Sequence, residues 1–95
     1  MKTIAVVDIG KTNAKVVLVD GEDFREVAAR TMPNGVVNAA PYPHFDTEKL
    51  WAFLLESFAA LGRERPIDAI SVTTHGATVA LVGEDGDLVL PVLDY

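Results

Sequence analysis

Residues 4–19 read IAVVDIGKTNAKVVLV, two apolar runs joined by a short polar connection. Residues 4–9 and 16–19 are apolar at nearly every position, a pattern typical of strands buried on both faces of a sheet. Between them, residues 10–13 supply the glycine and the asparagine that tight hairpins favour. The stretch therefore predicts a β-hairpin near the start of the chain.

Beyond the hairpin, the chain predicts an α/β order. Residues 20–23 are a turn signal, and residues 24–32 can return as a third, edge-like antiparallel strand. Residues 33–45 hold three of the five prolines and predict a surface loop. A helix should follow. After it we expect a strand over 67–74 parallel to the first, and a terminal hairpin formed by residues 77–82, the turn 83–87 and residues 88–92.

The predicted helix begins after the proline-rich loop. Asp46 or Thr47 can cap its first turn, where Glu48 also suits the helix dipole. Its apolar residues recur at helical spacing until Gly62 and Pro66 end it: Leu50, Trp51, Leu54, Leu55, Phe58 and Leu61. This stripe should face the core, with Trp51 and Phe58 as packing residues.

Composition narrows the classes of partner. The chain has 95 residues, enough for one domain, and 49% of them are hydrophobic, which favours a packed core. The net charge is -6 and the basic residues are scattered, so nucleic acid is not an expected partner. Without cysteine there are no disulfides, thiolate chemistry or cysteine zinc sites. No apolar run reaches the roughly 20 residues of a membrane span. We expect a cytoplasmic protein with no membrane partner.

The hairpin connection carries the richest chemistry. Asp8, at a strand end, can hold a hydrated Mg²⁺, and Gly10 lets the backbone approach a phosphate closely. Hydroxyl, amide and N–H groups of the turn can donate to phosphate oxygens. An ordinary polar hairpin with an exposed aspartate and two exposed lysines is an equal alternative. A Walker A loop is excluded, because Ala5 stands where that motif needs its first glycine.

A second group of polar residues follows the predicted strand 67–74. His75 and Gly76 lie where ligands gather in open α/β sheets, so the imidazole can hydrogen-bond a hydroxylated substrate. The alternative is a histidine satisfied within its own loop. His44, in the proline-rich loop, has no partner in the sequence and is interpreted as a surface residue. No acidic or imidazole group stands near His75 at metal-ligand spacing, so we expect no transition-metal site.

Two strings together carry a family resemblance. VDIGKTNAKVVLVD (7–20) resembles the first phosphate motif of the actin, Hsp70 and sugar kinase superfamily, and AISVTTHGATVALVGEDGDLVLPVLDY (69–95) resembles a sugar-contacting segment of the FGGY carbohydrate kinases. The resemblance runs from Lys2 to Tyr95. It implies an incomplete ribonuclease H-like (actin-like ATPase) fold, in which residues 1–95 are the amino-terminal part of the first kinase domain and the second, nucleotide-binding domain is absent.

The resemblance also implies roles for individual residues. Asp8 would act near Mg²⁺, through water, and near the phosphates of ATP. The residues that would contact the phosphates are Gly10, Lys11, Thr12, Asn13 and Lys15. Lys11 replaces the small hydroxyl residue that most members carry. Its positive charge still suits phosphate, and the chain resembles in this respect the branch of the family that handles deoxy sugars such as fuculose or rhamnulose.

On the sugar side, the resemblance implies that His75, Gly76 and Tyr95 contact the substrate. Thr74 departs from the Met or Gln that many members carry. The catalytic aspartate would lie beyond residue 95. The predicted function is therefore the amino-terminal fragment of an ATP-dependent carbohydrate kinase, inactive by itself, that works with ATP, Mg²⁺ and a sugar. The alternative is a non-catalytic sugar- or phosphate-binding module. Missing cover over the sheet would expose apolar surface and favour self-association.

Overall fold

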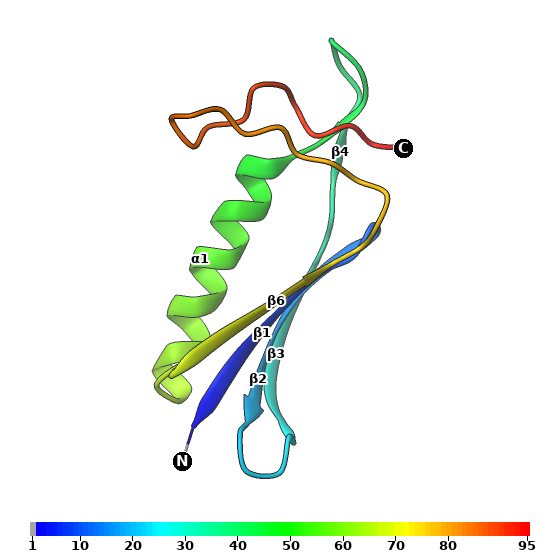
Figure 1. Cartoon of the computed structure of the whole chain (residues 1–95). Helices are drawn as coiled ribbons and strands as arrows, with labels where there is room; N and C mark the ends of the chain where they lie inside the picture. Colours follow the sequence, from blue (N-terminus) through cyan, green and yellow to red (C-terminus); the bar gives the residue numbers. More distant parts are fainter. Residues whose placement is uncertain (1) are drawn as a thin grey trace.

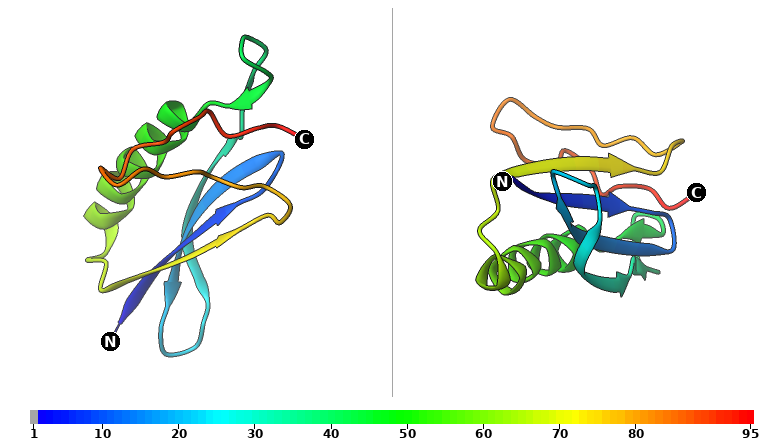
Figure 2. Two further views of the ribbon diagram at one scale, coloured as in Figure 1. Left: turned by 45° about the horizontal axis from the view of Figure 1, so that its top comes forward. Right: turned by 90° about the horizontal axis from the view of Figure 1, so that it is seen from below.

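The computed structural model describes residues 2–95, which form a mixed sheet with one helix packed on one of its faces (Figures 1 and 2). The main sheet has four strands in the order β3-β2-β1-β6. Its strands are β1 (Thr3–Ile9), β2 (Asn13–Asp20), β3 (Glu26–Pro33) and β6 (Ala69–Thr74). A two-stranded ladder is formed by β4 (Val36–Val37) and β5 (His44–Phe45), and the helix α1 spans Thr47–Glu64.

The strand pairing confirms the predicted α/β order. β1 pairs antiparallel with β2 from Thr3↔Asp20 to Ile9↔Ala14, and β2 pairs antiparallel with β3. β6 pairs parallel with β1, so that these two strands end at the same edge of the sheet. The helix lies between β5 and β6 in the chain and forms part of the crossover that the parallel pair of β1 and β6 requires.

The helix is anchored at both ends by side chains. Oδ1 of Asp46 accepts a hydrogen bond from the N–H of Lys49 at 3.1 Å, so Asp46, rather than Thr47, is the cap. The helix passes through Gly62, where we predicted its end, and reaches Glu64. At that end, Arg65 Nη1 lies 3.1 Å from Oδ2 of Asp20 and ties the helix to the end of β2.

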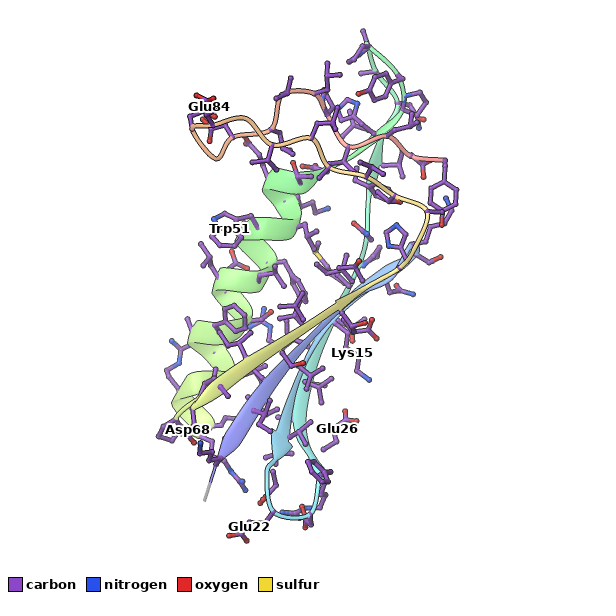
Figure 3. The ribbon with its side chains drawn as sticks, viewed as in Figure 1. Lys15, Glu22, Glu26, Trp51, Asp68 and Glu84 are labelled. Atoms are coloured by element: carbon purple, nitrogen blue, oxygen red, sulfur yellow. The ribbon has the colours of Figure 1, made fainter. Side chains whose placement is uncertain are left out.

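The core lies between α1 and the sheet. Its buried residues are Ala5, Val7, Ala14, Val16, Leu18, Phe53, Leu54 and Leu61. The predicted helix stripe is partly wrong, because Trp51 is 61% exposed and Leu55 is 49% exposed. The helix packs against β2 and β3 through Phe53 and Ser57, and this rotation turns Trp51 away from the sheet (Figure 3). Trp51 and Leu55 instead line a wide hollow beside residues 86–88.

The sheet is buried on one face only, which corrects the prediction of strands buried on both faces. Burial alternates along β1 and β2, with Ala5, Val7 and Leu18 facing α1. The opposite face is half-buried because no element of residues 2–95 packs on it. Every residue of β6 is exposed, since α1 does not reach this edge strand.

Three further segments differ from the predictions. Phe24 lies in the β2–β3 turn with φ 58° and is 75% exposed, rather than in the third strand. The loop 33–45 contains the short β4–β5 ladder. Residues 77–82 form no strand, although the turn 83–87 is confirmed by the Gly83 N–H, which donates to the Asp87 carbonyl at 2.9 Å. The terminal hairpin is thus reduced to the bridge Val82↔Leu88. Such short pairing is expected where few neighbouring strands reinforce it.

The terminal segment, residues 75–95, runs from the end of β6 past the start of α1 and back (Figure 1). The Phe45 N–H donates to the carbonyl of Val92 at 2.9 Å, which joins this segment to β5. Within the part of the chain that the structure describes, no helix is long and apolar enough to cross a membrane.

Candidate functional site

One row of polar side chains crosses the main sheet where β1 ends. Asp8 stands opposite Lys15 of β2 and opposite Thr73 of β6. Strand alternation places this row on the face away from α1, because Val7 points toward the helix. Asp8 is exposed and makes no hydrogen bond or ion pair with another of residues 2–95. Nζ of Lys15 is 3.9 Å from Oε1 of Glu26 on the same side of the sheet (Figure 3).

The hairpin turn, residues 10–13, follows directly after this row. The N–H of Gly10 donates to the carbonyl of Asn13 at 2.8 Å. A Cβ atom on residue 10 would lie 3.0 Å from that carbonyl oxygen, a close approach that favours glycine here. Thr12 and Asn13 are exposed. Their N–H, hydroxyl and amide groups can therefore reach an anion outside the turn.

Asn34 holds this turn, a role that sequence reasoning missed. Its backbone N–H donates to the carbonyl of Thr12 and its Nδ2 donates to the carbonyl of Gly10, both at 2.8 Å. The residue is 7% exposed. In the sequence, Asn34 stood only within the predicted surface loop, residues 33–45. The contact joins residues 24 positions apart, so no local pattern points to it.

The side chain of Lys11 reaches the terminal segment. Its Nζ is 3.1 Å from Oδ1 of Asp94 and 2.6 Å from the carbonyl oxygen of Tyr95. The same ammonium lies 4.4 Å from the centre of the Tyr95 ring, within cation–π range. The structure thus brings a predicted phosphate contact and a predicted sugar contact together. Asp94, whose carboxylate contacts Lys11, was not singled out from the sequence, although it adjoins Tyr95.

His75 is held on both sides. Its N–H donates to the carbonyl of Ile9 at 2.9 Å, and its Nδ1 lies 3.2 Å from the same oxygen. Because a carbonyl only accepts, Nδ1 carries a proton, and Nε2 lies within hydrogen-bond distance of Oγ1 of Thr78, at 2.9 Å. The ring packs near Phe45 and Tyr95, with centroids 5.5 and 6.1 Å away.

The other predicted residues lie around the same edge. The Tyr95 hydroxyl donates to the carbonyl of Gly76 at 3.1 Å, so the three predicted sugar contacts adjoin one another. Ala77, beside them, has φ 64°, in the left-handed region that favours glycine. His44 is half-buried in β5 rather than on the surface, and its Nδ1 lies 2.8 Å from the carbonyl oxygen of Tyr42.

A hollow of about 260 Å³ lies between the hairpin, α1 and the terminal segment. Among the residues that line it are Asn34, Phe45, Thr74, His75, Thr78 and Val92. Its wall is mostly apolar, with a few polar groups, as is usual for small-molecule sites. Oδ1 of Asn34 is buried and has no hydrogen-bond partner among residues 2–95.

The site suits one kind of metal binding. In residues 2–95, no three His, Cys, Asp or Glu side chains gather closely enough to hold a metal ion. Asp8 is a single exposed carboxylate beside the exposed Thr12 and Asn13 of the turn. Magnesium commonly binds through one or two carboxylates, phosphate oxygens and several waters. The residues therefore fit a hydrated Mg²⁺ that arrives with a nucleotide.

Comparison with solved structures shows which proteins share this arrangement. A carbohydrate kinase from Novosphingobium aromaticivorans is 31% identical, with a TM-score of 0.83, over 100% of this chain and 20% of its own. A ligand-bound xylulose kinase from Lactobacillus acidophilus is 22% identical over 98% of this chain and 19% of its own, with a TM-score of 0.78. Plasmodium falciparum glycerol kinase with ADP is 13% identical over 98% of this chain and 20% of its own, with a TM-score of 0.69.

The chain thus spans about a fifth of the length of these kinases. No protein-family model matches the sequence, and no curated protein sequence matches it. The structural likeness nevertheless covers every element of the chain, from the hairpin to the terminal segment. It confirms the resemblance to the amino-terminal part of the FGGY carbohydrate kinases, and this chain has the actin-like ATPase fold of that part.

Proposed function

We propose that this chain forms the phosphate- and sugar-contacting side of an ATP-dependent carbohydrate kinase, which transfers the γ-phosphate of ATP to a sugar hydroxyl. One observation carries the proposal. The hairpin turn and residues 75–76 meet at the edge where β1 and β6 both end, with the His75 N–H bonded to the Ile9 carbonyl. Ligands of open α/β sheets gather at such an edge. The 31% identity to a carbohydrate kinase over the whole chain supports the same function.

On the nucleotide side, Asp8 would hold Mg²⁺ through water, Gly10 would let the backbone approach the phosphates closely, and Thr12 and Asn13 would donate backbone and side-chain groups to them. Bound Mg²⁺ would supply charge neutralisation to the transferring phosphoryl group. Lys15 adds a positive charge on the same face of the sheet. ADP is present in the related glycerol kinase structure, which supports a nucleotide ligand.

On the acceptor side, we assign His75, Gly76 and Tyr95 to the sugar. Both ring nitrogens of His75 already have partners, so His75 would reach a sugar hydroxyl by exchanging its Thr78 partner. Lys11 lies between the two sides, because its ammonium contacts both Asp94 and Tyr95. A paired ammonium and carboxylate can donate to one hydroxyl and accept from its neighbour.

Phosphoryl transfer needs a base that orients the acceptor and a nucleotide clamped in line with it. We propose that these belong to the four-fifths of the kinase length that this chain does not span, and that residues 1–95 are the amino-terminal part of the first domain. The 95-residue chain should therefore bind without turnover. Sugar-dependent release of ADP above background in a steady-state assay would contradict this.

The binding half of the proposal is tested by NMR titration of the ¹⁵N-labelled chain with MgADP and MgATP. Saturable shifts at the amides of residues 10–15 are expected. They should weaken in Asp8→Asn and persist in the matched variant Glu84→Gln, whose carboxylate lies in the distant turn 83–87 (Figure 3). A folded chain with no shift at these amides, or with equal shifts in both variants, would remove the assignment of the hairpin to phosphate.

A further inference from the structure

The side chain of Asn34 occupies an unusual position for a loop residue. It comes from the connection between β3 and β4, yet only 7% of the residue is exposed, and its side chain points at the hairpin turn. Nδ2 donates to the Gly10 carbonyl at 2.8 Å. The bonded partner is an acceptor, which assigns Nδ2 and Oδ1 without ambiguity. Oδ1 then remains without a partner in residues 2–95.

Three hydrogen bonds determine the shape of the turn, and two of them come from Asn34. The Gly10 N–H donates to Asn13 across the turn. Asn34 then donates from outside, through its backbone to Thr12 and through its side chain to Gly10. The side-chain bond fixes the orientation of the Gly10 peptide plane. The groups that would face a phosphate therefore take their direction from a residue that does not itself belong to the turn.

Asn34 also links the turn to the helix. The carbonyl of the next residue, Gly35, accepts from the N–H of Asp46 at 3.0 Å, and Asp46 caps α1. A continuous set of bonds thus runs from the turn through residues 34–35 to the first turn of the helix.

We propose that Asn34 is a positioning residue that fixes the conformation of the hairpin turn, residues 10–13, for phosphate binding. The phosphate half of this inference rests on the proposed function. The conformational half does not, and the two can be measured separately. Asn34 contacts no nucleotide in this scheme. It acts through the carbonyls of Gly10 and Thr12.

The first experiment needs no variant and no ligand. A through-hydrogen-bond NMR coupling between Asn34 Nδ2 and the Gly10 carbonyl carbon is expected in the wild-type chain. The second compares Asn34→Ala with Asn38→Ala, which removes an exposed asparagine from the same loop. In Asn34→Ala, loss of the bond to the Gly10 carbonyl should loosen the turn, so that the Gly10 N–H, which is bonded to Asn13 within it, exchanges about five- to tenfold faster. Amides of Val16 and Leu18 should keep their wild-type rates, which separates this effect from global unfolding.

The nucleotide titration completes the test. If the wild type binds MgADP, Asn34→Ala should bind about five- to tenfold more weakly and Asn38→Ala equally well. A missing coupling, or Gly10 exchange unchanged in Asn34→Ala, would overturn the inference even if nucleotide binds. A loosened turn with unchanged MgADP affinity would overturn its phosphate half. A wild type that binds no nucleotide but shows the coupling and the loosened turn would contradict the proposed function and support the positioning of the turn by Asn34.

Discussion

The ammonium of Lys11 lies 3.1 Å from the carboxylate of Asp94, although 83 positions separate the two residues. This ion pair joins the hairpin turn to the last residues of the chain. The ring of Tyr95 lies 4.4 Å from the same ammonium and reinforces the contact. A residue that we assign to the nucleotide and one that we assign to the sugar are therefore in direct contact.

Loss of this ion pair should loosen the terminal segment and leave the rest of the chain intact. The Lys11 and Asp94 side chains are 43% and 24% exposed, so the pair should contribute at most about 1 kcal/mol to stability. We expect Asp94→Asn to abolish the NOE between Lys11 and the Tyr95 ring and to broaden residues 90–95. Glu84→Gln removes the same charge from the turn 83–87 and should change neither. Retention of the NOE in Asp94→Asn would show that the ring, rather than the carboxylate, holds Lys11.

Asp20 should make stability depend on pH. Donation by the Glu22 N–H at 2.9 Å and then the Arg65 guanidinium at 3.1 Å lower the pKa of Asp20 below 3.8, against the opposing effect of burial. The folded state therefore binds this proton less readily than the unfolded state. The resulting stabilisation is present above pH 3.8 and is lost as the pH falls through the folded pKa.

Urea denaturation should show this difference. Asp20→Asn should be less stable than the wild type at pH 7, and the gap should narrow as the pH falls below 3.8. Asp23→Asn, in the same turn but exposed, is the matched control and should be destabilised less than Asp20→Asn at pH 7. A gap that stays constant between pH 7 and pH 3 would mean that Asp20 stabilises the fold only through neutral hydrogen bonds.

The helix cap distinguishes the two candidates left open by the sequence. Asp46 accepts from the Lys49 N–H, whereas Thr47 is the first residue of the helix. Asp46→Ala should lower the free energy of unfolding by about 1 kcal/mol, and Thr47→Ala should change it by less than about 0.5 kcal/mol. Equal losses in thermal or chemical denaturation would contradict the assignment of the cap.

Two adjacent leucines test which face of α1 is buried. Leu54 is 9% exposed and packs in the core, whereas Leu55 is 49% exposed. Leu54→Ala should cost about 2–5 kcal/mol, because it removes buried methyl groups and leaves a cavity. Leu55→Ala should cost less than about 1 kcal/mol. Similar losses at both positions would show that the rotation of the helix in solution differs from this one.

The exposed edge strand should promote self-association. Ile70 is 56% exposed and Val72 is 62% exposed on β6, whose outer edge has no paired strand among residues 2–95. Light scattering after size exclusion should show a mass that rises with concentration. The double variant Ile70→Lys, Val72→Lys should reduce it, whereas Val79→Lys, an exposed position outside the strand, should not. A wild type that remains monomeric at every concentration would contradict the prediction.

Local patterns were sufficient for most of the elements. The hairpin, the antiparallel third strand, the helix and the parallel β6 were predictable, since apolar runs, turn residues and helical spacing are properties of neighbouring residues. The orientation of α1 was not. Trp51 and Phe53 are both apolar, and only the packing of the helix against β2 and β3 places Phe53 in the core.

The sequence by itself determined the hairpin, the helix and the glycine turn after Asp8, because each depends on contacts between residues close in the chain or on simple periodicity. Only the tertiary structure decided that Asn34 holds the turn, that Lys11 reaches Asp94, and that one face of the sheet stays open. These features join residues tens of positions apart, and their partners are selected by the packing of whole elements, which no local pattern records.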